Sequence, residues 1–228
     1  MKRYLRFFTL IIIGILFLFS GCDKKIDVTG VKIYPSVSVI KVGETKQLTA
    51  IVTPDNADDM SVTWNIQPVW MIDTEKVNSI SENGKVTGNA EGCASIICIT
   101  NQLFYEDRAY VYVGYAAAVD AMYSGHLYKE DKEINTAQKI GIVRISEYKA
   151  KFGLPFLSGV SPDYCEITVD TISEKMRFEG SDSISVGGVM TLIEVSGAVG
   201  LQDGRGDFKI FVGKDVYSFN GAKEPRNH

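Results

Sequence analysis

Short runs rich in Val, Ile, Thr, Tyr and Phe recur along the chain after residue 22, and Gly, Asn and Asp interrupt them at close spacing. β-branched and aromatic residues favour strands, and the interrupting residues favour turns. No long stretch of this part has apolar residues at the 3.6-residue period of a helix. The pattern therefore restricts the chain to an all-β fold.

The first set of runs lies within residues 28–113, and its alternation predicts seven short strands. Asn83-Gly84 separates two of these runs and predicts a hairpin, because a type I′ turn needs positive φ at both central residues. Seven short strands in about 87 residues are typical of an immunoglobulin-like sandwich. The runs are VKIYPSVSVI, QLTAIV, SVTWNI, VNSI, KVTG, ASIICIT and AYVYV.

Residues 28–113 also resemble a group 2 bacterial immunoglobulin-like domain, the type found in intimins and invasins. The resemblance is carried by VKIYPS, VGETKQLTAIVTPDNA, VTWNI, NGKVTGNAEG and AYVYV, which are spread over the whole segment. It implies that Trp64 fills the space between two sheets and that the glycines serve turns or close packing. It further implies a spacer or adhesive module at a bacterial surface rather than an enzyme.

Residues 114–119, GYAAAV, are interpreted as a short linker, and about eight further strand-like runs follow within 120–228. An antiparallel sheet of this size removes its edges by closing into an up-and-down barrel. The segment resembles the calycin-like domains of gut Bacteroidetes lipoproteins through YSGHL, VSGAVGL, DFKIFV and YSFNGAK. The Gly-x-Trp motif that opens lipocalins is absent, since His126 and Leu127 follow Gly125.

The predicted barrel strands place bulky apolar residues on one face. Alternation along DFKIFV puts Phe208, Ile210 and Val212 on the same side, and VYSFNG does the same with Tyr217 and Phe219. An eight-stranded barrel is only just wide enough to hold side chains. We therefore expect a filled interior, although a lipocalin-like small-molecule carrier remains an alternative function for this segment.

The first 22 residues have the layout of a cleavable signal peptide. Lys2, Arg3 and Arg6 precede an apolar run at 7–19, which is too short to span a bilayer as a helix. Leu18-Phe19-Ser20-Gly21-Cys22 resembles the lipobox of bacterial lipoproteins. The resemblance implies a signal peptide at 1–21, lipid on Cys22, and a tether at 22–27 that joins the protein to a membrane. We expect the outer membrane, on its periplasmic or its outer face.

Charge and cysteine content argue against a nucleic-acid-binding protein and against a disulfide. Without residues 1–21 the chain has 21 Lys and Arg against 28 Asp and Glu, a net charge of −7 that argues against nucleic acid as a partner. Cys93 and Cys98 lie five residues apart on one predicted strand, too far for a disulfide, and Cys165 is the other cysteine after Cys22. We interpret these three residues as buried apolar side chains.

The sequence offers no catalytic residues, and we expect no enzyme, no cofactor and no metal. His126 and His228 are the only histidines, and nucleophile, zinc-protease and dinucleotide motifs are absent. Asp55, Asp58 and Asp59 crowd one loop, but they lack the glycine of a calcium-binding EF-hand loop and suit a turn.

Candidate binding residues lie in predicted connections. Trp70 belongs to a lengthened loop, and Phe104 with Tyr105 precedes the last sandwich strand; exposed aromatics on loops suit glycan or protein contacts, or else cap the core. Arg205-Gly206-Asp207 matches the integrin-recognised tripeptide at an expected hairpin tip, although Gly206 is also an ordinary turn residue. These features favour a non-catalytic adhesive module for a surface glycan or host protein; the alternative is a structural envelope component without a diffusible ligand.

Overall fold

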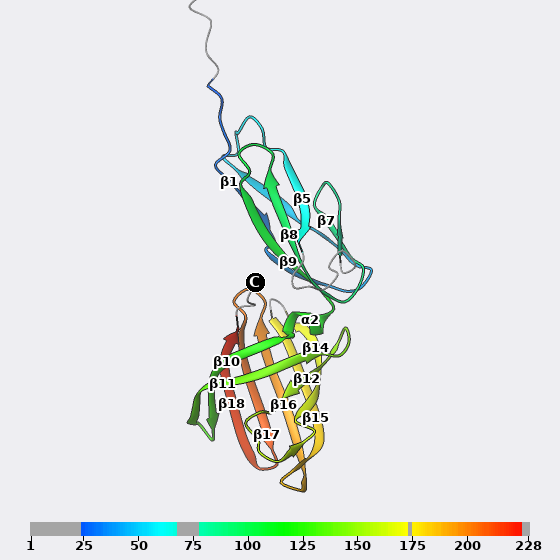
Figure 1. The fold of residues 1–228 in the computed structure, drawn as a ribbon, viewed down its shortest axis with the longest axis vertical. Helices are drawn as coiled ribbons and strands as arrows, with labels where there is room; N and C mark the ends of the chain where they lie inside the picture. Colours follow the sequence, from blue (N-terminus) through cyan, green and yellow to red (C-terminus); the bar gives the residue numbers. More distant parts are fainter. Residues whose placement is uncertain (1–23, 68–77, 173–174, 225–228) are drawn as a thin grey trace, which may run out of the picture.

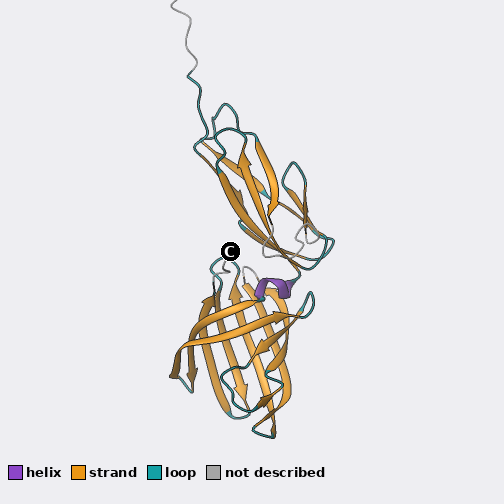
Figure 2. Ribbon diagram, in the orientation of Figure 1, coloured by secondary structure: helices purple, strands orange, loops and turns teal. Residues whose placement is uncertain are grey.

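The computed structural model describes residues 24–67, 78–172 and 175–224 and confirms the all-β prediction. A β-sandwich is followed by a closed β-barrel, and a single-turn helix lies between them (Figures 1 and 2). The first described residues and the barrel lie at opposite ends of the sandwich (Figure 1).

The sandwich consists of one four-stranded sheet, β2-β9-β8-β5, and two smaller sheets, β1-β4 and β3-β7-β6. Its strands pair antiparallel except β2 and β9, which run parallel. The strand bounds are β1 Gly30–Tyr34, β2 Val37–Ile40, β3 Thr45–Gln47, β4 Thr49–Thr53, β5 Val62–Gln67, β6 Asn78–Ile80, β7 Lys85–Gly88, β8 Gly92–Thr100 and β9 Glu106–Val113.

The structure divides two of the predicted strands. Pro35 interrupts the run VKIYPSVSVI, so that β1 pairs with β4 while β2 crosses to the other sheet and pairs with β9. Proline has no backbone N–H to donate to a sheet, which makes it suited to such a break. A second break at Leu48 separates β3 from β4, and the Leu48 amide instead donates to the carbonyl of Gly84 at 3.0 Å.

The sandwich core lies between the large sheet and the small ones, and it includes Ile33, Val86, Ile96 and Val111. Trp64 is half-buried and packs against this core from β5, with its ring against the Asn83-Gly84 turn. Gly84 has a φ of +80°, and a side chain there would collide with both the Trp64 ring and the Leu48 carbonyl. Both the turn type and the packing therefore require glycine at this position.

The barrel closes from eight antiparallel strands, as the sequence predicts. The strands follow the order β15-β14-β12-β11-β10-β18-β17-β16, and β16 pairs back to β15 over their whole lengths; the short β13 pairs with the end of β15. The bounds are β10 Ala121–Lys129, β11 Lys132–Arg144, β12 Lys149–Gly153, β13 Val160–Ser161, β14 Tyr164–Ile172, β15 Lys175–Val186, β16 Val189–Gly200, β17 Arg205–Val212 and β18 Asp215–Lys223.

Aromatic rings fill the barrel interior. Phe208 stacks on Phe219 with ring centroids 5.1 Å apart and meets Tyr123, Phe152 and Phe178 edge to face at 5.2 to 5.4 Å. All five side chains are buried, as is Ile210, while Val212 at the strand end is partly buried. The inward face predicted for DFKIFV therefore forms the centre of a packed core, as expected for bulky residues in a barrel of this size.

The segment expected to be a linker is a buried helix. Residues Tyr115–Val119 form α2, whose Ala116, Ala118 and Val119 belong to the barrel core. The sequence interpretation needs correction here, because three consecutive alanines suit a tight helical turn packed over a barrel end as well as they suit a flexible connection. No helix in the described part of the chain is long and apolar enough to cross a bilayer.

Polar and aromatic contacts join the sandwich to the barrel around α2. Arg144 on β11 forms an ion pair with Glu91 at 3.2 Å, and the Lys41 ammonium lies 5.8 Å from the centre of the Tyr115 ring. Lys223 on β18 lies over the Tyr112 ring and donates to the carbonyl of Ala118. Val39 on β2 and Tyr112 on β9 also pack against the barrel core. The two units therefore share a junction of charged, aromatic and apolar side chains around the buried helix.

Candidate binding surfaces

The outer wall of the barrel carries an open groove of about 330 Å³ over β10, β18, β17 and β16. Because Phe208 and Phe219 point into the core, their neighbours Asp207, Lys209 and Asn220 point outward. The strand register brings the outward residues together, since Asp207 is paired with Asn220 and Lys209 with Ser218. The groove is lined by Tyr128, Ser196, Gly197, Asp207, Phe208, Lys209, Ser218, Phe219 and Asn220.

The chemistry of the groove is mixed. Tyr128 contributes an aromatic ring, Lys209 a cation and Asp207 an anion, while small serines leave space between them. The Asn220 amide donates to the Asp207 carboxylate at 2.6 Å, which fixes both polar groups on the wall. Such a surface offers a flat apolar face beside hydrogen-bonding groups, the combination that suits a sugar ring or a polar peptide segment.

Of the polar side chains that line this groove, only Asp207 is among the site residues predicted from the sequence. Tyr128, Lys209 and Asn220 were missed because each lies within a predicted strand, where outward residues are usually interpreted as solvated. The alternation of DFKIFV and VYSFNG already placed Lys209 and Asn220 outward. The pairing of four strands that brings Tyr128 beside them is not readable from one sequence.

Arg205-Gly206-Asp207 does not form a hairpin tip, contrary to the sequence interpretation. The tripeptide is the beginning of β17 and pairs in register with Asn220, Gly221 and Ala222 of β18. Arg205 and Asp207 face outward and line a second depression of about 240 Å³, which shares Asp207 with the groove. An extended tripeptide in the middle of a sheet lacks the protruding turn that motivated the adhesive interpretation.

Gly206 is not a turn residue either. It is buried and faces the interior, where an added Cβ would lie 2.6 Å from the ring of Phe208. The turn before it is made by Gly204, with a φ of +64°, and by Asp203, whose carboxylate accepts the Arg205 amide at 3.0 Å. Packing therefore explains the glycine of the tripeptide.

Phe104 and Tyr105 lie in the loop between β8 and β9, at the end of the sandwich remote from the barrel. Phe104 is 78% exposed, Leu103 beside it is 56% exposed, and Tyr105 is also exposed. The structure does not bring this loop near the barrel groove. Trp70, Cys22 and His228 lie outside the described residues, and β5, which precedes Trp70, ends away from the loop.

The remaining candidates have structural partners. His126 on β10 contacts Glu133 on the exposed outer face. Asp58 accepts the Ile26 amide at 2.7 Å, and Asp59 accepts both the amide and the hydroxyl of Ser61, which lowers the pKa of the Asp59 carboxyl. Within the described ranges no group of three or more His, Cys, Asp or Glu is arranged to hold a metal ion.

The cysteines in the described residues form no disulfide. Cys98 on β8 and Cys165 on β14 are fully buried, as predicted, whereas Cys93 is only half-buried. Burial, with a smaller contribution from nearby carboxylates, raises the pKa of both Cys98 and Cys165 to about 11. Neither thiol is set up as a nucleophile, because a reactive cysteine needs a lowered pKa and access to solvent.

Comparison with known proteins identifies the family of the β-sandwich domain. Residues 27–109 match the family of bacterial Ig-like domains of group 2, so this segment is a domain of that class. No curated protein matches the chain. Among solved structures, human protocadherin-24 EC1-2 is similar at 9% identity over 87% of this chain and 100% of that chain, with a TM-score of 0.29. Ig-like and β-barrel folds are typically non-enzymatic.

Proposed function

We propose that this protein is a lipid-anchored, non-catalytic binding module of a bacterial cell envelope, and that it recognises a glycan through the outer wall of its barrel. The observation that carries the proposal is the open groove that contains Tyr128, Asp207, Lys209 and Asn220. Its volume of about 330 Å³ lies at the small end of the usual range for ligand sites, which suits one sugar unit of a longer chain.

Because the interior of the barrel is filled, we place ligand binding on its outer surface. A lipocalin-like carrier needs an enclosed space, but Phe208, Phe219, Phe178, Phe152 and Tyr123 occupy the centre of this barrel. The filled interior therefore argues against the carrier alternative. The purely structural alternative remains the rival, because it needs no ligand-binding surface at all.

Two further features support an envelope protein. Group 2 bacterial Ig-like domains are commonly related to adhesion, and here the domain separates the barrel from the beginning of the described chain (Figure 1). The amino-terminal sequence ends its apolar run in Ser20-Gly21-Cys22, which motivates lipidation of Cys22 and attachment to the outer membrane. In this arrangement the groove lies away from the membrane.

The glycan site is tested by screening residues 23–228 on an array of bacterial, plant and mammalian oligosaccharides. We expect a reproducible signal that Tyr128→Ala reduces at least tenfold, because stacking on an aromatic face supplies much of the affinity for a sugar. Tyr34→Ala is the matched control, since Tyr34 is an exposed tyrosine of the sandwich. A silent array favours the structural rival, and capture of a protein through Tyr128 assigns the groove to a protein ligand instead.

The anchor is tested separately by growing cells that express the full chain with a labelled fatty acid. We expect label on the protein and none on Cys22→Ala, because the acylated thiol is then missing. Ser20→Ala is the control, since a small residue before the cysteine keeps the lipobox. Label that persists on Cys22→Ala contradicts lipid anchorage.

A further inference from the structure

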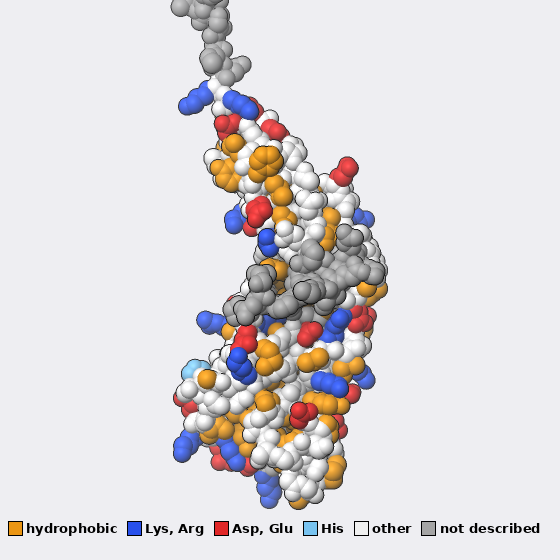
Figure 3. All heavy atoms as spheres, in the orientation of Figure 1, with side chains coloured by type: hydrophobic (Ala, Val, Ile, Leu, Met, Phe, Trp, Pro, Cys, Tyr) orange, Lys and Arg blue, Asp and Glu red, His pale blue; other side chains and the backbone are white. Residues whose placement is uncertain are grey.

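The end of the sandwich where the described chain begins is apolar at its tip. Leu103, Phe104 and Tyr105 are exposed in the β8–β9 loop, and Ile26 and Met60 are exposed in two loops at the same end of the sandwich. Figure 3 shows hydrophobic side chains on this end of the sandwich, next to the first described residues. We call these five residues the apolar tip. Exposed apolar groups that gather in one place indicate a contact surface.

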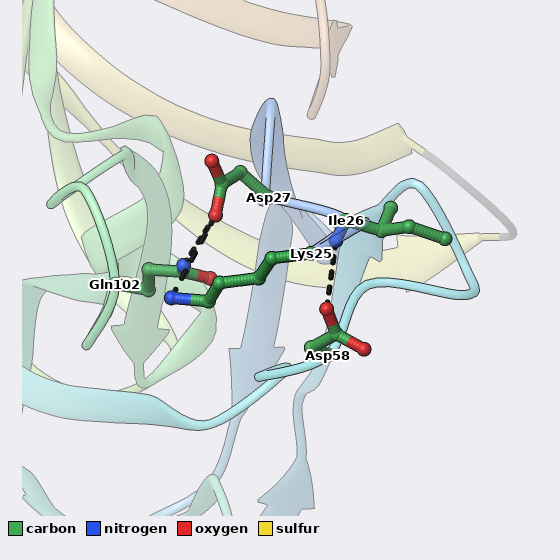
Figure 4. A network of polar contacts seen from close by, with 5 residues as sticks. All are labelled: Lys25, Ile26, Asp27, Asp58 and Gln102. Carbon is green, nitrogen blue, oxygen red and sulfur yellow. Dashed lines mark hydrogen bonds and ion pairs between the residues drawn. The ribbon is translucent and has the colours of Figure 1, made fainter. Parts of the chain in front are cut away.

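Hydrogen bonds join the three loops that carry the apolar tip. The amide of Ile26 donates to the Asp58 carboxylate at 2.7 Å, and the Gln102 side chain donates to Asp27 at 2.7 Å (Figure 4). Asn101 donates from its backbone to the carbonyl of Ser61 at 3.0 Å, which ties the β8–β9 loop to the loop of Met60. These bonds hold the three loops together at this end of the sandwich, and the Ile26 side chain points away from Gln102 (Figure 4).

The backbone of the β8–β9 loop is held in a rare conformation. Leu103 and Phe104 have φ values of +62° and +54°, in the left-handed region that bulky residues seldom occupy. Thr100 stabilises this turn, since its hydroxyl accepts the Tyr105 amide at 3.0 Å and donates to the Gln102 carbonyl at 2.7 Å. The result is that Phe104 projects into solvent instead of folding back onto the core. Strain that persists at an exposed apolar residue points to a function.

Chain length links this tip to the lipid anchor. Ile26 lies four residues after Cys22, and four residues of fully extended chain span at most roughly 14 Å. A lipidated Cys22 lies at the bilayer surface, where the headgroup layer is about 5 to 8 Å thick on each side. Ile26 is hydrogen-bonded into the apolar tip, so the whole tip is confined close to the membrane.

The charges beside the tip favour apolar insertion over electrostatic attraction. Lys24 and Lys25 precede it, but Asp27, Asp58 and Asp59 lie in the same loops. No excess of positive charge is left to attract anionic lipid. Phe and Leu side chains partition into the acyl boundary, and tyrosine prefers the headgroup level.

We propose that the apolar tip inserts into the interface of the bilayer that carries the lipid anchor and holds the sandwich against that membrane. The proposal rests on the proposed lipidation of Cys22. The partner is a phospholipid surface, not a diffusible glycan or protein, and it gives the protein a second attachment beside the lipid. One lipid chain gives only weak membrane binding, and an additional apolar contact strengthens it.

The test uses residues 22–228 with Cys93→Ala, coupled through Cys22 to a maleimide phospholipid in phosphatidylcholine vesicles. Cys98 and Cys165 are buried and do not compete for the reagent. Phe104→Trp introduces the reporter, and the emission of the parent protein is subtracted. Met190→Trp is the matched control, because Met190 is 68% exposed in the β15–β16 hairpin at the opposite end of the barrel from α2.

We expect bromine-labelled acyl chains to quench most of the emission of the Phe104→Trp reporter and to leave the control unquenched, at low and at high salt alike. Equal quenching at both positions, or quenching that high salt abolishes, overturns the proposal. An unquenched reporter overturns it as well. If the Phe104→Ser variant then loses glycan or protein binding, the loop binds that ligand instead of lipid. Because the lipid is attached in vitro, these outcomes are independent of fatty-acid labelling in cells, which tests the anchor itself.

Discussion

At the scale of single residues, the two buried thiols make stability depend on alkaline pH. Cys98 and Cys165 have a pKa of about 11 in the folded protein, mainly because of burial, against 9.0 for an unperturbed thiol. Between these values the unfolded chain has lost the thiol protons that the folded chain keeps. The contribution is therefore complete below pH 9 and is lost as pH rises toward 11.

Removing one thiol should flatten this dependence. We expect Cys98→Ala to lose less stability than the parent between pH 8 and 10.5, by up to about 2 kcal/mol at the upper limit, because a shift of one pKa unit is worth about 1.4 kcal/mol. Urea unfolding followed at several pH values measures the difference. A variant with the same slope as the parent would show that Cys98 does not titrate between the two states.

Substitutions at Gly206 and Arg205 distinguish the packing role of the tripeptide from its role at the surface. Gly206→Ala should destabilise the barrel by about 1 to 3 kcal/mol, since the new Cβ meets the Phe208 ring in a filled core. Arg205→Ala, at an exposed neighbour, should change stability by less than about 0.5 kcal/mol. Urea midpoints compare the two variants, and an Arg205 effect as large as that of Gly206 would contradict this division.

At the scale of elements, alternation within β17 separates the residues of the core from those of the outer wall that carries the groove. Phe208→Ala should cost about 3 to 5 kcal/mol, because it removes the ring that touches four other aromatics. Phe211→Ala is the control on the same strand, as its ring is partly exposed under the Lys209 ammonium. Equal losses of stability in chemical unfolding would show that the interior of the barrel is loosely packed.

The local sequence pattern was sufficient to predict much of the fold. Alternation and turn residues predicted most of the barrel strands and the buried face of Phe208. Asn83-Gly84 predicted its hairpin, but not as a type I′ turn, because Gly84 has a positive φ and Asn83 does not. Local pattern failed at Pro35, where one run divides between two sheets, and at α2, where five residues are too few to show a helical period. The groove was not predictable, because it depends on long-range pairing of β10, β18, β17 and β16.

At the scale of the whole molecule, the buried helix decides where the two units separate. The sequence predicts that residues 27–114 and 115–228 fold independently, and this division leaves α2 with the barrel whose core it completes. The charged contacts across the junction are partly exposed and add little stability, and the apolar contribution of the sandwich is limited to the partly buried Val39 and Tyr112. We therefore expect two cooperative melting transitions from the two separate fragments.

A third fragment, the barrel without α2, measures how much the helix stabilises the barrel. Residues 120–228 lack α2, and we expect them to melt at a lower temperature than 115–228, because Ala116, Ala118 and Val119 no longer cover the end of the core. Calorimetry of the three fragments measures this. Unfolded products from the 27–114 and 115–228 fragments would show that the junction is essential for folding.

The parallel pairing of β2 with β9 has a mechanical consequence. A pull between a membrane and a ligand on the barrel would draw the start of β2 and the end of β9 in opposite directions, and in a parallel pair these ends lie at opposite edges. The four residue pairs from Val37–Tyr110 to Ile40–Val113 are then sheared together instead of opening one after another. Since all these hydrogen bonds must break at once, this pairing would resist a pull between the proposed lipid anchor and a ligand on the barrel more strongly than a pair of strands that opens one bond at a time.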